Sequence, residues 1–212
     1  LPTGWGVEQQ ITCVDGSTFQ IYMANMKSIF MDMIKNTDMV IFNRCKKEDP
    51  LPTYRRGIKV ANQRAEVIFE DEEGELGDIF QDEMPFDMNA PVIEILPEDY
   101  GIWFVDAMDH PENYEGKTVK FKARVMKPRG MGSKFFVPGR TAMTCCADDT
   151  TFLGYVCKSA YAPKLTPGEW VEVTAKVGIE KRNEYQGEEG IVLAAEHVEQ
   201  CDPLEDEMVY FN

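Results

Sequence analysis

The sequence lacks most of the features that mark the commoner functional classes. Its 212 residues contain no run of about 18 apolar residues, so we expect no transmembrane helix in the chain. Only two histidines occur, His110 and His197, and no CxxC pair is present, which argues against a histidine-rich metal site, a zinc ribbon or a thioredoxin-type motif. No Ser-His-Asp order, phosphate-cradling glycine loop or paired-carboxylate signature is visible either. These absences point away from the familiar enzyme classes.

Basic residues are also scarce. The chain has 22 Lys and Arg against 37 Asp and Glu, a formal net charge of −15. Such a surface repels phosphate backbones, because nucleic-acid affinity comes mainly from Lys and Arg that displace counterions. We therefore expect no nucleic-acid partner. The chain begins at Leu1 rather than at a methionine, from which we expect a trimmed product of a longer precursor.

What the sequence does contain is ordinary globular composition, with 43% hydrophobic residues, and clear alternation in its C-terminal half. Residues 117–126 place Val119 and Phe121 on one face and Lys120 and Lys122 on the other, the pattern of a half-buried antiparallel strand. Residues 169–179 repeat this pattern. We expect three further strands, at 133–147, 152–158 and 190–198.

A helix is expected before these strands, over residues 97–110. Its apolar residues fall on one helical face and Pro111 ends it: Tyr100, Trp103, Phe104, Ala107 and Met108. One helix and five short antiparallel strands within about 100 residues favour a small closed or partly closed β-barrel, with the OB-fold as the leading candidate.

The N-terminal half predicts a smaller α+β region. An amphipathic helix is expected over residues 19–34, with Ser17 or Thr18 as its cap. Strands are expected at residues 10–14, 39–44, 58–60 and 65–70. The helix carries a stripe of apolar side chains: Phe19, Tyr22, Met23, Met26, Phe30, Met33 and Ile34. The methionines allow two interpretations, an adaptable binding face or a core face, and such a stripe is far more often core.

The acidic, glycine-punctuated stretch 70–87 separates the two halves. We place the boundary near residue 90. The expected organisation is an N-terminal α+β region over 1–90 with the acidic linker at its end, and an OB-like barrel domain over 91–212. The fold class is therefore α+β, mainly β.

Two adjacent cysteines, Cys145 and Cys146, lie in an expected strand. Successive side chains on a strand point to opposite faces, so we expect Cys145 in the core and Cys146 on the wetter face with Arg140 and Asp148. Three interpretations stay open. Cys146 is an incidental surface thiol, or it is functional, with Arg140 stabilising its thiolate and Asp148 joining it around a metal ion such as zinc, or it forms a disulfide in an oxidising compartment.

The loop 127–134 is a second candidate feature. Its Lys127, Arg129 and Lys134, with nearby Arg140, form a local basic cluster in an acidic protein. It connects the first two expected barrel strands, and in OB-folds that connection often contacts ligands. The alternative is an ordinary solvated hairpin loop.

From about Val92 to its end, the chain resembles the C-terminal soluble domain of the YcgQ-like family, uncharacterised bacterial membrane proteins. The resemblance is carried by HPENYEGKTVKFKARVM at 110–126, FFVPGRTAMTCCADDTTFLGYV at 135–156, GEWVEVTAKV at 168–177 and the acidic, aromatic tail CDPLEDEMVYFN. The combination of Arg140, Cys145-Cys146 and Asp148 is its most specific part. Asp149 stands where relatives often carry a second alanine.

The resemblance implies location and architecture rather than mechanism. Members of that family typically carry short N-terminal transmembrane helices, hold this domain outside the membrane and are encoded beside a predicted permease. An extracytoplasmic, membrane-associated location with a membrane partner such as a permease follows from this resemblance.

The first hypothesis is accordingly a non-enzymatic extracytoplasmic domain that binds a ligand, a metal ion or a membrane partner. Its surface would be formed by the strand and loop residues singled out above: Arg140, Cys146, Asp148, Lys127, Arg129 and Lys134. The alternative is a thiol-based redox enzyme or sensor with Cys146 as nucleophile. A third possibility is a structural ectodomain whose cysteines are buried or disulfide-bonded.

Overall fold

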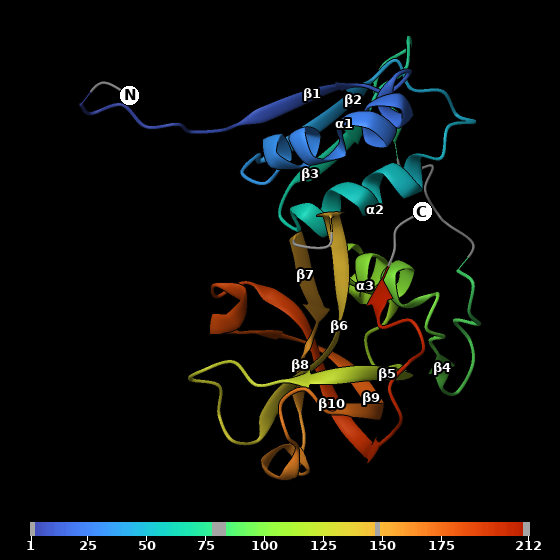
Figure 1. Ribbon diagram of the computed structural model, residues 1–212, viewed down its shortest axis with the longest axis vertical. Coiled ribbons are helices and arrows are strands. Elements are labelled where there is room, and N and C mark those ends of the chain that lie inside the picture. Colours follow the sequence, from blue (N-terminus) through green and yellow to red (C-terminus); the bar gives the residue numbers. More distant parts are fainter. Residues whose placement is uncertain (1–2, 78–83, 147–148, 210–212) are drawn as a thin grey trace. The chain divides into compact units, whose positions relative to one another are not determined.

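A computed structural model describes residues 3–77, 84–146 and 149–209, with the backbone alone for Cys145 and Cys146. The chain divides into two compact units (Figure 1). The first comprises Leu1–Asp82 with Met143–Thr151 and Phe211–Asn212, and the second comprises Glu83–Ala142 and Phe152–Tyr210. Among the residues described, no helix has the length and apolar character needed to cross a bilayer.

The first unit alternates strands and helices. Its elements are β1 (Ile11–Asp15), α1 (Phe19–Ile34), β2 (Met39–Asn43), α2 (Leu51–Ala61) and β3 (Glu66–Phe69). The three strands are parallel, in the order β1-β2-β3. Every second strand residue is buried against the helices, as for Val14, Val40 and Phe42, and Phe19 of α1 packs its ring edge-on to Phe42 at 4.9 Å. Alternating burial along the strands thus defines one core between the sheet and the two helices.

The expected strand at 58–60 is wrong, because these residues lie inside α2. Leu51, Tyr54 and Ile58 follow the i, i+3, i+7 spacing of a helix, and all three are buried. Pro52 lies in the first turn of the helix, where its missing N–H has no helical partner to lose. The short alternating stretch Ile58–Val60 resembles a strand only when it is considered without the helical turn before it.

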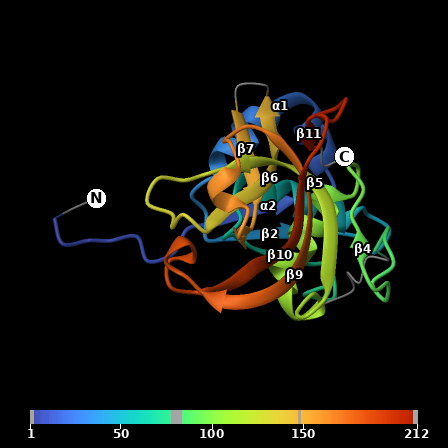
Figure 2. The ribbon, with the colours of Figure 1, turned by 90° about the horizontal axis from the view of Figure 1, so that it is seen from below.

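The second unit is a closed five-stranded barrel, as expected. It is formed by β5 (Thr118–Met126), β6 (Phe135–Cys146), β8 (Val156–Lys158), β9 (Trp170–Lys181) and β10 (Glu189–Gln200), and β7 (Asp149–Gly154) pairs with β6. Of β6 and β7, the residues up to Ala142 and from Phe152 belong to this unit. The ring runs β5-β6-β8-β10-β9 and returns to β5, and only the β8–β10 pairing is parallel. The strands curve around a shared interior (Figure 2). The prediction of an α+β, mainly β protein with an OB-like barrel is confirmed.

Shorter elements complete this unit. They are β4 (Ile93–Glu94) beside β5, α3 (Tyr100–Asp109), β11 (Met208–Val209) beside β6, and the 3-10 turns Pro111–Asn113, Ala162–Lys164 and Asn183–Tyr185. Trp103 of α3 packs its ring 4.8 Å from that of Phe121, and the Tyr155 hydroxyl donates to the carbonyl of Phe104. The apolar face expected on this helix therefore packs against barrel residues.

Alternation predicts the facing of two strands and fails for a third. On β5, Val119, Phe121, Ala123 and Val125 are buried, and β9 buries the alternate residues Val171, Val173, Ala175 and Val177. On β6 the expected facing holds at Val137, which is buried, and is reversed at most other described positions. The even-numbered Phe136, Arg140, Ala142 and Thr144 are buried, whereas the odd-numbered Phe135, Thr141 and Met143 are partly exposed.

Two glycines allow β6 and β7 to approach closely. A Cβ at Gly139 would lie 2.3 Å from the carbonyl oxygen of Leu153, and one at Gly154 would lie 2.6 Å from that of Pro138. Both obstructing atoms belong to the backbone, so neither can rotate away. The pairing of these strands therefore requires the absence of a side chain at both positions.

We predict that Gly139→Ala destabilises the barrel by about 2 kcal/mol, because an extra methyl group in a filled space forces the backbone apart. The measurement is the urea-induced unfolding of the variant, followed by tryptophan fluorescence. Gly178→Ala on β9 is the matched control, because its added Cβ would meet only an ordinary contact 3.7 Å from Val192 O. Equal stability of the two variants would contradict this account.

Candidate functional site

Arg140, expected on a solvated face, is almost completely buried, with 2% of its surface exposed. Its Nη1 donates to the carbonyl of Pro97, and its Nη2 donates to the carbonyls of Asp206 and Met208, both at 3.0 Å. Its guanidinium also lies 5.6 Å from the centre of the Tyr100 ring. The side chain thus joins the segment before α3 to the segment around β11.

The electrostatics of Arg140 are those of a structural cation. Burial lowers the pKa of its guanidinium from the usual value, and the neighbouring Tyr100 and Asp206 oppose that shift. A guanidinium nevertheless stays charged in proteins, so three carbonyl dipoles replace the water that this charge has lost. Its Nε is buried and, among the residues described, has no hydrogen-bond partner. Arg140 is therefore not available as an anion-binding group on the barrel surface.

Asp148 and the side chain of Cys146 lie outside the described residues, as does the side chain of Cys145. Within the described part of the chain, no group of three or more His, Cys, Asp and Glu side chains is arranged to hold a metal ion. The zinc and thiolate hypotheses for Cys146 and Asp148 stay predictions.

The loop between β5 and β6 presents the predicted cations in two different ways. Lys127 Nζ donates to the carbonyls of Ala162 and Leu165, both at 2.6 Å, so this ammonium fastens the loop to the turn before β9. Arg129 and Lys134 are exposed. The carbonyl of Lys134 accepts a 2.9 Å hydrogen bond from the Ser159 amide. The loop is thus anchored at Lys127 and Lys134 and exposes the side chains of Arg129 and Lys134.

Arg182 is a further cation beside this loop, and it was not predicted from the sequence. Arg182, at the end of β9, places its guanidinium 4.4 Å from the centre of the Phe135 ring. It also forms ion pairs with Glu184 at 3.0 Å and with Glu180 at 3.7 Å. The hydrogen bonds that Arg182 donates to the Glu184 carboxylate raise the pKa of Arg182. The connection between the fourth and fifth barrel strands is the other ligand-contacting loop of OB-folds, and this rule could have identified Arg182.

Three of the remaining thiols have a pKa that burial raises, which makes them poor nucleophiles. Burial raises the pKa of Cys45 to about 11 and that of Cys157 to about 12. It also raises the pKa of Cys201. Because the thiolate is the reactive form, these shifts make the three thiols less reactive near neutral pH. Cys13 differs in being exposed on β1.

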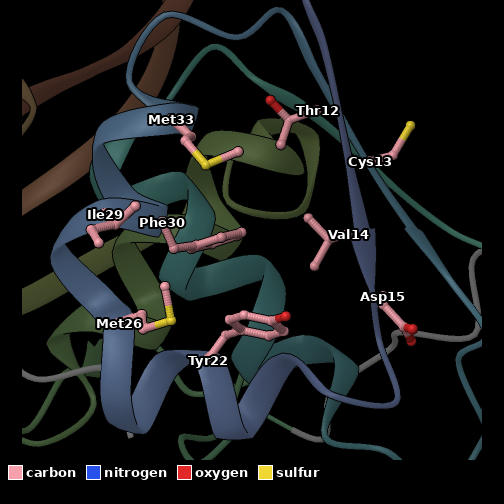
Figure 3. Close-up of a pocket in the computed structure, with 9 residues that line it drawn as sticks. All are labelled: Thr12, Cys13, Val14, Asp15, Tyr22, Met26, Ile29, Phe30 and Met33. Atoms are coloured by element: carbon pink, nitrogen blue, oxygen red, sulfur yellow. The ribbon is translucent and has the colours of Figure 1, made fainter.

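The first unit has a separate apolar groove between β1 and α1 (Figure 3). Its cavity measures about 270 Å³, and its lining is mostly apolar: Thr12, Cys13, Val14, Asp15, Tyr22, Met26, Ile29, Phe30 and Met33. Tyr22, Met26 and Met33 were expected in the core, but they are exposed. Phe19 and Ile34 of the same predicted stripe are buried. The core interpretation holds for only part of this helix.

Comparison with known protein families gives one match over most of the chain. The family described as the DUF1980 C-terminal domain matches residues 75–211. The chain belongs to this family. The DUF1980 domain thus covers the barrel, with both loops described above. The YcgQ-like resemblance and its membrane context stay predictions. No curated protein matches the chain.

Solved structures share only a general likeness with this DUF1980 protein. A mitochondrial single-stranded DNA binding protein of S. cerevisiae is 10% identical with a TM-score of 0.24, covering 41% of this chain and 95% of the other. An aspartyl tRNA synthetase of Entamoeba histolytica is 15% identical with a TM-score of 0.29, covering 56% of this chain and 27% of the other. Neither similarity is close enough to bear on function.

We predict that Arg140→Met lowers the free energy of unfolding by about 3 kcal/mol or more, because buried carbonyls on two segments lose a charged donor. Arg140→Lys should restore little, since one ammonium cannot reproduce the fork of the guanidinium. Urea unfolding measures both variants, with the exposed Arg129→Met as control. A stable Arg140→Met protein would show that this cation has no such structural role.

We predict that iodoacetamide at pH 8 modifies Cys13 in the folded chain at least about 100-fold faster than Cys45 or Cys157, because a thiol of pKa 11 is only roughly a thousandth ionised there. Modification rates come from quantitative peptide mass spectrometry, and unfolding in urea should equalise them. The same experiment reports on Cys146. A redox role for Cys146 requires faster modification than a free thiol of pKa about 8.5 shows.

Proposed function

We propose that this chain is a non-enzymatic binding domain, and that the exposed cations of the loop 127–134 contact an acidic surface of a membrane partner. The observation that carries the proposal is an anchored loop with exposed Arg129 and Lys134 in a chain of net charge −15. A cationic region on an acidic protein orients it toward anionic surfaces and sets the register of contact. The overall negative charge of the chain repels an acidic partner, so the partner would bind only at the local cationic loop. This restriction gives the contact its specificity.

The hydrogen bonds of the loop order its surface before a partner binds. The two hydrogen bonds of Lys127 hold the loop where its exposed cations project. Phe135 follows the loop directly, with Arg182 across its ring. A surface that is ordered before binding loses less conformational entropy on contact. Aromatic and arginine side chains are also enriched where partners bind.

The location and the class of partner rest on the family resemblance. We infer an extracytoplasmic domain of a membrane-associated protein, acting with a permease encoded beside it, as the YcgQ-like resemblance implies. Membership of the DUF1980 family supports the domain assignment on which this proposal rests. In this proposal Arg140 acts only indirectly, by stabilising the barrel that carries the loop.

We predict that the double variant Arg129→Glu, Lys134→Glu weakens binding to the permease by about tenfold or more, because like charges then face each other across the contact. The chain and the permease are co-expressed, and the complex is quantified after affinity purification from detergent-solubilised membranes. Lys176→Glu with Lys181→Glu is the control, since it changes the net charge equally at exposed positions of β9. Equal losses in the two double variants would exclude the loop as the contact surface.

A further inference from the structure

The outer edge of β1 has hydrogen-bonding groups with no strand beside them in the part of the chain that the structure describes. In the sheet order β1-β2-β3, β1 pairs with β2 alone. Gln10 accepts from the Met39 amide, and the Gly16 amide donates to Asn43, so even-numbered residues face β2. The amides of Ile11, Cys13 and Asp15 and the carbonyls of Ile11 and Cys13 then point away from it, because backbone groups alternate along a strand. The carbonyl of Asp15 accepts from the Thr18 amide and hydroxyl.

The cavity described above lies beside this same edge. Thr12 and Val14 point from β1 toward α1, whereas Tyr22, Phe30 and Met33 project from α1 toward β1 (Figure 3). A strand placed along β1 would send every second side chain into this space, because alternate residues of neighbouring strands share a face. The free backbone edge and the apolar cavity are therefore complementary to one extended segment.

Exposed apolar side chains gather around this groove. Among the described residues, six of the eleven large exposed hydrophobic side chains lie on β1 and α1, and four of these line the groove: Tyr22, Met26, Ile29 and Met33. On α1 these include Met26, Ile29 and Met33, with 43%, 57% and 54% of their surface exposed. Contiguous exposed apolar surface marks interaction sites in soluble proteins. The concentration on one strand and one helix distinguishes the groove from the rest of the described surface.

The small number of charged side chains in the lining of the groove indicates which kind of molecule could bind there. Asp15 is the only ionisable carboxylate of the lining, and it is held by Ser17 and by Arg44 at 2.7 Å, at the end of the strand. The Ser17 hydrogen bond lowers the pKa of Asp15. An occupant of the cavity therefore needs apolar side chains. A second copy of the chain is opposed by repulsion between two proteins of net charge −15.

We propose that β1 and α1 form a docking groove for an extended segment of a partner polypeptide, which adds to the sheet as a strand beside β1. Backbone hydrogen bonds to Ile11, Cys13 and Asp15 supply affinity. Apolar side chains at alternate positions of the partner enter the cavity and contact Met26 and Phe30. Strand addition of this kind combines backbone pairing with pockets that select alternate side chains.

The test uses the full chain and a soluble peptide, acetyl-KTVTVTK-amide, whose valines alternate with threonines. The control peptide has its five central amides N-methylated, which removes the donors and blocks pairing. In ¹⁵N-edited NMR titrations, the first peptide should shift and protect the amides of Ile11, Cys13 and Asp15, and the second should not. Met26→Asp should weaken binding at least tenfold, whereas Leu96→Asp, at a residue of similar exposure outside the groove, should not.

Each other outcome overturns the proposal. Equal shifts with both peptides would mean that backbone pairing does not hold the segment. The absence of any shift at these amides would show that the groove does not accept an extended peptide. Dimerisation in sedimentation experiments, with the same three amides protected as concentration rises, would identify a second copy as the occupant.

Discussion

The architecture of the barrel unit depends on one buried cation, the guanidinium of Arg140. Removing such a charge from water costs several kcal/mol unless hydrogen bonds replace the lost hydration. The carbonyls of Pro97, Asp206 and Met208 provide that replacement, and they come from segments far apart in the chain. Each of these segments is therefore held where its carbonyl meets the guanidinium. The cation fixes two segments of backbone, at Pro97 and at residues 206–208, against β6.

This constraint determines which charges remain for recognition. Arg140 and Lys127 donate to backbone carbonyls, so both serve the internal structure. Arg129 and Lys134 are exposed. A cluster of four basic residues in the sequence thus separates into two structural cations and two surface cations. In the proposed function, the two structural cations hold the loop and the strand that follows it, and the two exposed cations of the loop make the contact.

The sequence predicts the barrel well where one face of a strand is charged. On β5, Lys120 and Lys122 alternate with buried Val119 and Phe121, so the facing is unambiguous. On β6, Phe135, Phe136 and Val137 follow one another, and alternation alone gives no facing. Arg140 then misleads, since its carbonyl partners lie 43, 66 and 68 residues away in the sequence. No local pattern reveals a cation whose burial depends on such distant groups.

Helix α1 shows a different limit of sequence periodicity. Apolar residues occupy more than one of its faces, so the same pattern includes the buried Phe19 and Ile34 and the exposed Met26 and Met33. Which face of α1 packs against the core depends on the position of β1 at the edge of the sheet. That position is set by the topology of the unit and not by the sequence of the helix. All-parallel sheets are normally covered on both faces, because the helices that connect their strands pack there. On the edge strand β1, backbone groups have no neighbouring strand among the described residues, and apolar side chains of α1 beside it are exposed. In the proposed docking, an added strand pairs with the backbone groups and covers the side chains. The recognition surfaces proposed for the two units thus differ in kind, one electrostatic and one apolar.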